Sequence, residues 1–344
     1  MILKAPFPWF GGKSKAADLV WSRMGDVGNY VEPFAGSLAV LLARPHEPRI
    51  ETVNDRDCYL ANFWRAVQKD PRKVARYADW PVNEADLQAR HKWLCARKRL
   101  RERILSEPHY FDPKVAGWWA WGISQWIGGG WCSRPEWIGR GGGGRAPRGL
   151  NASIHLSSEM GIFSNPDGMS KRPVLNRGAR GVTNVKRPNL SGNGSTGVHR
   201  KMDNSALLGW MEALADRIRR VRICCGDWSR IVTPSCTWKL GGGQLTGVFL
   251  DPPYSHEMRD NRLYSVEQDV GGAVRKWAIE NGDNPLLRIV LCGLEGEHAM
   301  PAGWESARWT SPRGYAKVTR KEVIWFSRHC IRQGGLFDAI ERGA

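Results

Sequence analysis

The sequence predicts a doubly wound α/β fold with a mostly parallel sheet that is interrupted by a basic insertion. Short apolar runs that end in acidic residues alternate with helical stretches at both ends of the chain, which is the pattern of a parallel sheet covered by helices. The middle of the chain is instead rich in Trp, Gly, Lys and Arg. We therefore expect one core built from residues 1–75 and 204–344, with residues 76–203 inserted between its two parts.

The N-terminal part predicts alternating helices and strands, followed by a long helix. Ser14 is the expected N-cap of a helix that runs to about Asp26. Residues 83–107 are expected to be strongly helical, with Asn83 as the N-cap and Pro108 after the end. The other expected elements are strands at Tyr30–Val31 and Glu51–Val53, a helix over Leu38–Ala43 and a helix over Tyr59–Lys69 that Pro71 closes.

The α/β pattern resumes at residue 204. An amphipathic helix is expected over Ser205–Arg220 and a second helix over Val266–Glu280. The expected strands are Val221–Cys225, Thr246–Leu250, Leu287–Cys292 and Glu322–Phe326. The run that ends at Leu250 is apolar throughout, which indicates a buried strand.

Composition points to a polyanionic partner. The chain has 344 residues, of which 42% are hydrophobic, and a formal net charge of +17. Residues 113–201 alone hold 13 Lys and Arg against 3 Asp and Glu, an excess that favours nucleic acid over a membrane surface. No run of about 18 apolar residues predicts a membrane span, so we expect a cytoplasmic protein. The eight cysteines lack the spacing of a zinc site, and we expect them to be reduced and structural.

The insertion combines aromatic and basic residues. Six of the 18 tryptophans fall in one stretch, at Trp118, Trp119, Trp121, Trp126, Trp131 and Trp137. Their spacing suits either stacking on bases or the buried face of a helix, and we favour the buried face for most of them. Two similar segments, Lys171–Leu175 and Lys186–Leu190, make Lys171, Arg172, Lys186 and Arg187 the expected contacts to phosphates. We expect the Gly-rich residues 138–200 to be partly disordered without a partner.

Acidic residues follow four of the expected strands, namely Glu32, Asp55, Asp227 and Asp251. Open α/β sheets bind ligands at the edge formed by the carboxyl ends of their parallel strands, so we expect these acids to meet there. An acid after the second strand is the usual partner of a ribose diol, and Gly36 would let the backbone approach a ligand closely. Asp251 continues into Pro252, Pro253 and Tyr254, a stiff, acceptor-rich segment that suits an amino group on a flat heterocycle. Taken alone, this segment fits a proline-rich turn equally well.

Four motifs follow one another along the chain, at Trp9–Lys13, Tyr30–Ser37, Asn54–Asp55 and Asp251–Tyr254. In this order they resemble the adenine-specific DNA methyltransferases of the Dam type, including phage-encoded members. The resemblance covers about residues 6–70 and 204–330 and is poor across 83–203, where the family places its target-recognition domain. It implies a seven-stranded methyltransferase sheet, S-adenosylmethionine as the cofactor, S-adenosylhomocysteine as its product and double-stranded DNA as the partner.

The resemblance also implies roles for individual residues. The residues implied to bind S-adenosylmethionine are Trp9, Lys13, Glu32, Phe34, Gly36, Asp55 and Asp227, with Lys13 near the methionine carboxylate, Asp55 at the ribose hydroxyls and Asp227 at the cofactor's amino group. The implied catalytic residues are Asp251, Pro252, Pro253 and Tyr254. The Asp251 side chain and the Pro252 carbonyl would accept hydrogen bonds from an adenine that has left the duplex and stacks on Tyr254. No metal is expected to take part.

Other interpretations of the same motifs stay open. The chain could methylate the amino group of cytosine, or RNA, or be a DNA-binding protein with an inactive core. Asp at position 251 favours adenine, because cytosine enzymes of this kind more often carry Ser there. The target sequence is not predicted, and a GATC site does not carry over. The resemblance implies restriction–modification or phage modification in a bacterial or phage-infected cell, near the nucleoid, by a monomer or a weak dimer.

Overall fold

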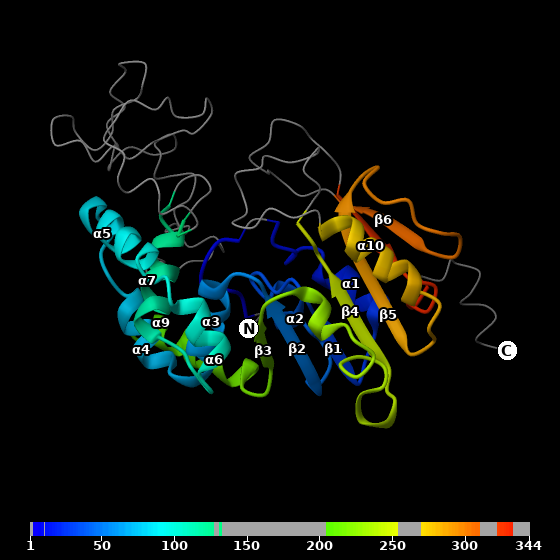
Figure 1. The fold of residues 1–344 in the computed structure, drawn as a ribbon, viewed down its shortest axis with the longest axis horizontal. Coiled ribbons are helices and arrows are strands. Elements are labelled where there is room, and N and C mark those ends of the chain that lie inside the picture. The colour runs from blue at the N-terminus through cyan, green and yellow to red at the C-terminus, as the bar shows by residue number, and fades with distance from the viewer. Residues whose placement is uncertain are drawn as a thin grey trace, which may run out of the picture.

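The computed structural model describes residues 3–9, 11–126, 131–132, 204–253, 270–309 and 322–332 (Figure 1). Its strands are β1 (Asn29–Glu32), β2 (Ile50–Asp55), β3 (Arg222–Cys225), β4 (Thr246–Leu250), β5 (Leu287–Leu294), β6 (Glu305–Trp309) and β7 (Glu322–Phe326). Its helices are α1 (Ala17–Met24), α2 (Ala39–Leu42), α3 (Cys58–Lys69), α4 (Pro71–Ala78), α5 (Glu84–Cys95), α6 (Leu100–Ser106), α7 (Pro113–Ile123), α9 (Asn204–Ile218) and α10 (Val270–Asn281). Two short 3-10 helices, η2 (Trp228–Ile231) and η3 (Leu240–Gly242), precede β4.

The seven strands form one sheet in the order β3-β2-β1-β4-β5-β7-β6. Strands β1 to β5 are parallel to one another, whereas β7 runs antiparallel to its neighbours β5 and β6. The strand order reverses direction between β1 and β4, which makes the carboxyl ends of these two strands the switch point where such sheets bind ligands. The predicted doubly wound, mostly parallel, seven-stranded sheet is confirmed.

Both faces of the sheet are buried. Side chains of a strand point alternately to its two faces, and Tyr30 and Phe249 accordingly belong to one hydrophobic cluster, which includes residues of α1. Their neighbours Val31 and Val248 belong to a second cluster, which includes Val274 and Ala278 of α10. The sheet is therefore the middle layer of three, which leaves the carboxyl ends of the parallel strands as the edge where a ligand is expected.

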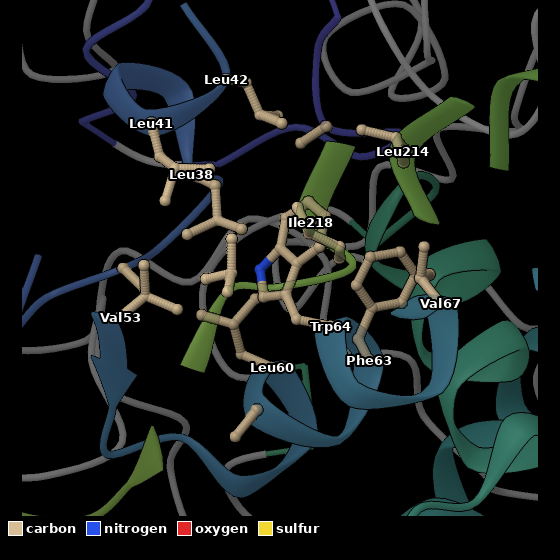
Figure 2. Packing of buried hydrophobic residues seen from close by; sticks show 14 of the residues in the cluster. Leu38, Leu41, Leu42, Val53, Leu60, Phe63, Trp64, Val67, Leu214 and Ile218 are labelled. Atoms are coloured by element: carbon tan, nitrogen blue, oxygen red, sulfur yellow. The ribbon is translucent and has the colours of Figure 1, made fainter. Parts of the chain in front are cut away.

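The larger cluster is packed around Trp64 of α3, which is 1% exposed. Figure 2 shows its indole ring among side chains that include Leu41 of α2, Val53 of β2 and Ile218 of α9. The indole N–H donates a hydrogen bond of 3.1 Å to the carbonyl of Gly36, in the turn after β1. The hydrophobic core thus fixes the position of a turn that belongs to the ligand-binding edge.

Helices α3 to α7 and α9 gather at the end of the sheet beside β3 (Figure 1). Helix α7 packs on α3 and α4, and its residues Trp119 and Trp121 are buried. For these two tryptophans the interpretation as helix core is confirmed. The expected boundary of the insertion at residue 75 falls inside α4, and the division into a core and an inserted region stays a prediction.

Residues 83–107 are helical, as expected, but the segment forms two helices in place of one unbroken helix. Asn83 does cap α5, since its side chain accepts from the N–H of Asp86 at 2.8 Å, but the helix ends at Cys95. A continuous helix would bring the charged residues at 97 and 98 onto the face that carries buried Leu94. The break at residues 96–99 instead lets Leu100 and Ile104 of α6 reach the core.

Smaller differences concern where helices begin. Ser14 does not cap α1, which begins at Ala17 after a turn in which the N–H of Ala16 donates to the carbonyl of Lys13 at 3.0 Å. Pro71 does not only close α3; it is the first residue of α4, where a missing N–H costs nothing. Helices α4 and α7 and strand β6 were not predicted.

Candidate active site

The switch point brings together three of the predicted site residues. Glu32 is the last residue of β1, Asp251 directly follows β4, and these two strands pair in the sheet. Lys13 reaches the same place from the turn before α1, with its ammonium 2.9 Å from Oδ2 of Asp251 and only 3% of its side chain exposed. A buried cation therefore lies directly against the Asp251 carboxylate, for which the resemblance implies a catalytic role.

Two further acceptors surround the Lys13 ammonium. It donates to the carbonyl of Gly11 at 2.8 Å and lies 3.5 Å from Oε2 of Glu322, the first residue of β7. Glu322 was missed by the sequence reasoning, which searched for acids at the carboxyl ends of strands. Because β7 is antiparallel to β5, it is the amino end of β7 that lies at this edge.

The carboxyls at this edge differ in their exposure and their partners. Burial raises the pKa of Glu32 well above its usual range, although its Oε2 accepts a hydrogen bond of 3.0 Å from the Tyr30 hydroxyl. Burial also raises the pKa of Asp251, and the Lys13 ammonium opposes that rise. The Asp251 side chain is 21% exposed. Lys13 thus favours the ionised, hydrogen-bond-accepting form of the carboxyl that a ligand can reach.

The turn after β1 is built around Gly36. Its φ of +46° lies in the region that favours glycine, and a Cβ atom at this position would lie 2.5 Å from Nε1 of Trp9. The N–H of Gly36 donates to Oδ2 of Asp55 at 3.1 Å, while its carbonyl accepts from Trp64. Trp9, Gly36 and Asp55 therefore lie side by side at the carboxyl ends of β1 and β2.

Asn54 of β2 connects the turns that follow the two neighbouring strands, β1 and β3. Its Nδ2 donates at 3.1 Å both to the carbonyl of Pro33, after β1, and to the carbonyl of Gly226, after β3. Its side chain is 2% exposed, so these bonds are shielded from water. The sequence placed Asn54 beside Asp55 without a role, and the role of the amide as a connector follows only from the observed strand order.

The Asp55 carboxylate accepts backbone hydrogen bonds on both of its oxygens. Oδ1 accepts from the N–H of Asp57 at 2.9 Å, and Oδ2 accepts from Gly36. Burial raises the pKa of Asp55 to about 7, against the effect of these hydrogen bonds. Its protonation state therefore changes near neutral pH.

Asp227 and two aromatic rings complete this edge on the side of β3. Asp227 is exposed, and its Oδ1 accepts from the N–H and the hydroxyl of Ser229 at 3.0 and 2.5 Å. These bonds lower the pKa of Asp227. The next residue, Trp228, stacks with Phe34, with ring centroids 6.2 Å apart. The turns after β1 and β3 are thus joined by flat apolar surface beside an ionised carboxylate.

Residues 9–106 match the family model of the D12 class of N6 adenine-specific DNA methyltransferases. This match confirms the resemblance to adenine-specific DNA methyltransferases. It includes Trp9, Lys13, Glu32, Gly36 and Asp55, and it extends further into residues 83–203 than the motifs indicated. No curated protein matches the chain.

The side chains at the carboxyl ends of β1, β2 and β3 have the chemistry that a nucleoside-containing ligand requires. The carboxylates of Asp55 and Asp227 are acceptors, as a ribose diol and an amino group require, and the Phe34 and Trp228 rings supply apolar faces. Within the described ranges, no group of three or more His, Cys, Asp or Glu side chains is arranged to hold a metal ion. No helix in the described part of the chain combines the length and apolarity needed to cross a membrane.

Several of the predicted site residues lie outside the described residues. These are Tyr254 of the catalytic motif and the expected phosphate contacts Lys171, Arg172, Lys186 and Arg187. Within the predicted catalytic motif, Pro252 is buried and Pro253 is half-buried. The eight cysteines are all free thiols, as predicted.

Proposed function

We propose that this chain transfers a methyl group from S-adenosylmethionine to the N6 amino group of an adenine that is flipped out of double-stranded DNA, at a selected sequence. One observation carries the proposal: the Asp251–Pro252 acceptor pair follows β4 at the switch point, with a buried ammonium against its carboxylate. The family match to residues 9–106 supports the reaction type, and the residues that would hold the cofactor lie along the same edge.

The proposed chemistry rests on hydrogen-bond acceptors. The lone pair of an adenine amino group is delocalised into the ring, which makes the nitrogen a poor nucleophile. Acceptance of its two protons by the Asp251 side chain and the Pro252 carbonyl would localise this lone pair on nitrogen. When bound, S-adenosylmethionine supplies the electrophilic methyl group. The N–C bond forms as the S–C bond breaks, and Asp251 is placed to take the proton that the nitrogen then loses.

Cofactor binding is assigned to the edge between β1 and β3. Asp55 would accept from the ribose hydroxyls and Asp227 from the cofactor's amino group, while Phe34 and Trp228 contact its flat base. Gly36 keeps the turn after β1 close enough for backbone contact, and Trp9 covers that turn. These roles follow from the chemistry of the side chains and from their common edge.

The substrate is assigned to duplex DNA. The strongly basic insertion suits the phosphate backbone. The amino group of a stacked, paired adenine cannot reach an acceptor pair at a sheet edge, so the base has to leave the helix. As the resemblance implies, the extruded base would stack on the ring of Tyr254.

The deciding experiment maps modified bases. DNA from cells that express the protein should contain N6-methyladenine within one sequence context, detected by sequencing that reads modified bases directly. Purified protein with labelled S-adenosylmethionine should transfer label to the same sites in duplex DNA. Label on cytosine, or label on RNA and not on DNA, would overturn the assignment of the substrate, and a failure to bind S-adenosylmethionine would overturn the proposed activity itself.

The pKa of Asp55 predicts how cofactor affinity depends on pH. If ribose hydroxyls bind the ionised carboxylate, a proton must be displaced below pH 7, because burial raises the pKa of Asp55 to about 7. Affinity should therefore rise by up to about tenfold per unit between pH 5.5 and 7 and level off above that range. Calorimetric titration of S-adenosylhomocysteine across this range measures the slope. Asp55→Asn should bind more weakly and flatten it, and an unchanged slope in this variant would assign the proton to another group.

The paired basic segments predict a dependence on salt. Neutralising Lys171, Arg172, Lys186 and Arg187 to Gln should weaken DNA binding and reduce the slope of log K against log salt, by up to about 0.9 for each phosphate that is no longer neutralised. Affinity for the cofactor should stay unchanged. Binding measured by fluorescence anisotropy at several salt concentrations tests this, and a wild-type slope would show that these cations do not contact phosphates.

A further inference from the structure

Glu322 lies at the same edge of the sheet as Asp251 because β7 is antiparallel to its neighbours β5 and β6. Its backbone pairs with Leu294 at the carboxyl end of β5, in antiparallel register. Its side chain is 12% exposed and points its carboxylate to Lys13, with Oε2 3.5 Å from the ammonium. A carboxylate from β7, which is separated from β4 by β5 in the sheet, thus lies next to the cation that contacts Asp251.

Lys13 is shared between the two carboxylates. The ammonium lies closer to Asp251, at 2.9 Å, than to Glu322, at 3.5 Å. It is 3% exposed, so solvent screens neither interaction strongly. The ammonium also donates to the Gly11 carbonyl at 2.8 Å, so acceptors of the protein itself lie around it.

We propose that Glu322 is a positioning residue of the methyl-transfer reaction, which shares the Lys13 ammonium with Asp251 and so sets how strongly the Asp251 carboxylate accepts from the target amino group. This assigns Lys13 to the catalytic carboxylate in place of the role beside the methionine carboxylate that the resemblance implies. The inference rests on the proposed function, because it concerns a residue of the same site.

The physical reason is competition for one cation. If Lys13 interacted with Asp251 alone, its charge would stabilise the carboxylate so well that the carboxylate would be a weak acceptor for an amino proton. Without Lys13, burial would favour the protonated acid, which cannot accept the same hydrogen bond. The negative charge of Glu322 offsets part of the effect of Lys13 on Asp251. Asp251 then stays ionised but remains basic enough to accept a proton.

Other ionisable groups face the same cluster and must be kept constant in any test. Among the described residues they are Glu32 from β1, Cys292 from β5 and Glu297 from the loop after β5. Glu297 is fixed by a hydrogen bond of 2.8 Å from the N–H of Leu294 to its Oε2. Lys13 is the cation that acts on both Asp251 and Cys292. Changing Glu322 or Lys13 therefore alters the charge near Asp251 in opposite directions.

The test measures kcat and KM for both substrates across pH 5 to 9 with the full-length protein. Glu322→Gln should lower kcat by about tenfold at pH 8, leave both KM values within about twofold, and move the acidic limb of the kcat profile to lower pH by at least about half a unit. Lys13→Met should move the same limb to higher pH. Glu322→Asp, which keeps the charge, should restore the position of the wild-type limb.

The control is Glu295→Gln. Glu295 follows β5 near the same edge, but its pair with Arg308 is exposed, so kcat and its pH profile should stay at wild-type values. If Glu322→Gln leaves kcat unchanged, or moves the limb in the same direction as Lys13→Met, the inference fails. A loss of cofactor binding in Glu322→Gln would also overturn it, since that result assigns Glu322 to cofactor binding. Wild-type protein that transfers no methyl group would contradict the proposed function and not this inference alone.

Discussion

Asp251→Asn is expected to lower kcat for methyl transfer by about 10²- to 10⁴-fold, while binding of cofactor and DNA changes little. Asparagine has nearly the shape of aspartate, but its amide has one acceptor end and one donor end. Lys13 lies 2.9 Å from the carboxylate and would attract the amide oxygen. The NH₂ end would then face the target amino group, so a donor would stand where the reaction needs an acceptor.

Single-turnover methyl transfer with labelled S-adenosylmethionine measures this effect without contribution from product release. A matched control is Asp283→Asn, since Asp283 is exposed and pairs with Arg328 on the surface. The control should keep wild-type kcat and stability. Residual activity above about one tenth in Asp251→Asn would show that Asp251 is not the acceptor, and a parallel loss of cofactor affinity would place it in the cofactor site.

The sequence could predict the edge of the sheet that carries the site because parallel strands impose it. Apolar runs identify buried strands, and the acids after them must share an edge whatever the loops do. The positions of Glu32, Asp55 and Asp251 follow from this rule alone, and the pairing of β1 with β4 makes two of them neighbours. Local pattern was also sufficient for the Asn83 cap, because capping is an interaction over three residues.

The parts that could not be predicted depend on contacts between distant segments. Glu322 has no distinguishing feature in the sequence, and only the antiparallel pairing of β7 brings it beside Lys13. Likewise, the reach of Lys13 to Asp251 spans most of the chain. The break between α5 and α6 depends on which side chains the core accepts, and helical propensity alone favoured one continuous helix.

Glu51→Gln is expected to destabilise the fold strongly, by about 3–5 kcal/mol. Glu51 lies in β2 with 3% of its side chain exposed, and its carboxylate accepts from Arg217 of α9 at 2.7 and 2.9 Å and from Arg44 at 3.3 Å. The same two guanidinium groups donate to the carbonyls of Leu41 and Val27. Removing the negative charge takes this counterion from Arg217 and from buried Arg44, which keeps only its ion pair of 3.5 Å with half-exposed Asp26. The loss would cost a large part of a typical stability of about 5–15 kcal/mol.

Urea unfolding followed by circular dichroism measures this effect, with Glu212→Gln as the control. Glu212 lies on α9, as Arg217 does, but the ion pair of Glu212 with Arg72 is exposed. Loss of this ion pair should cost less than about 1 kcal/mol. If the cost at Glu51 comes from uncompensated cations, the double variant Glu51→Met with Arg217→Met should be less destabilised than the sum of the two single variants. Additive losses would instead assign the effect to packing around β2. Because this network lies at the opposite end of β2 from Asp55, cofactor binding by the folded fraction should remain unchanged in either case.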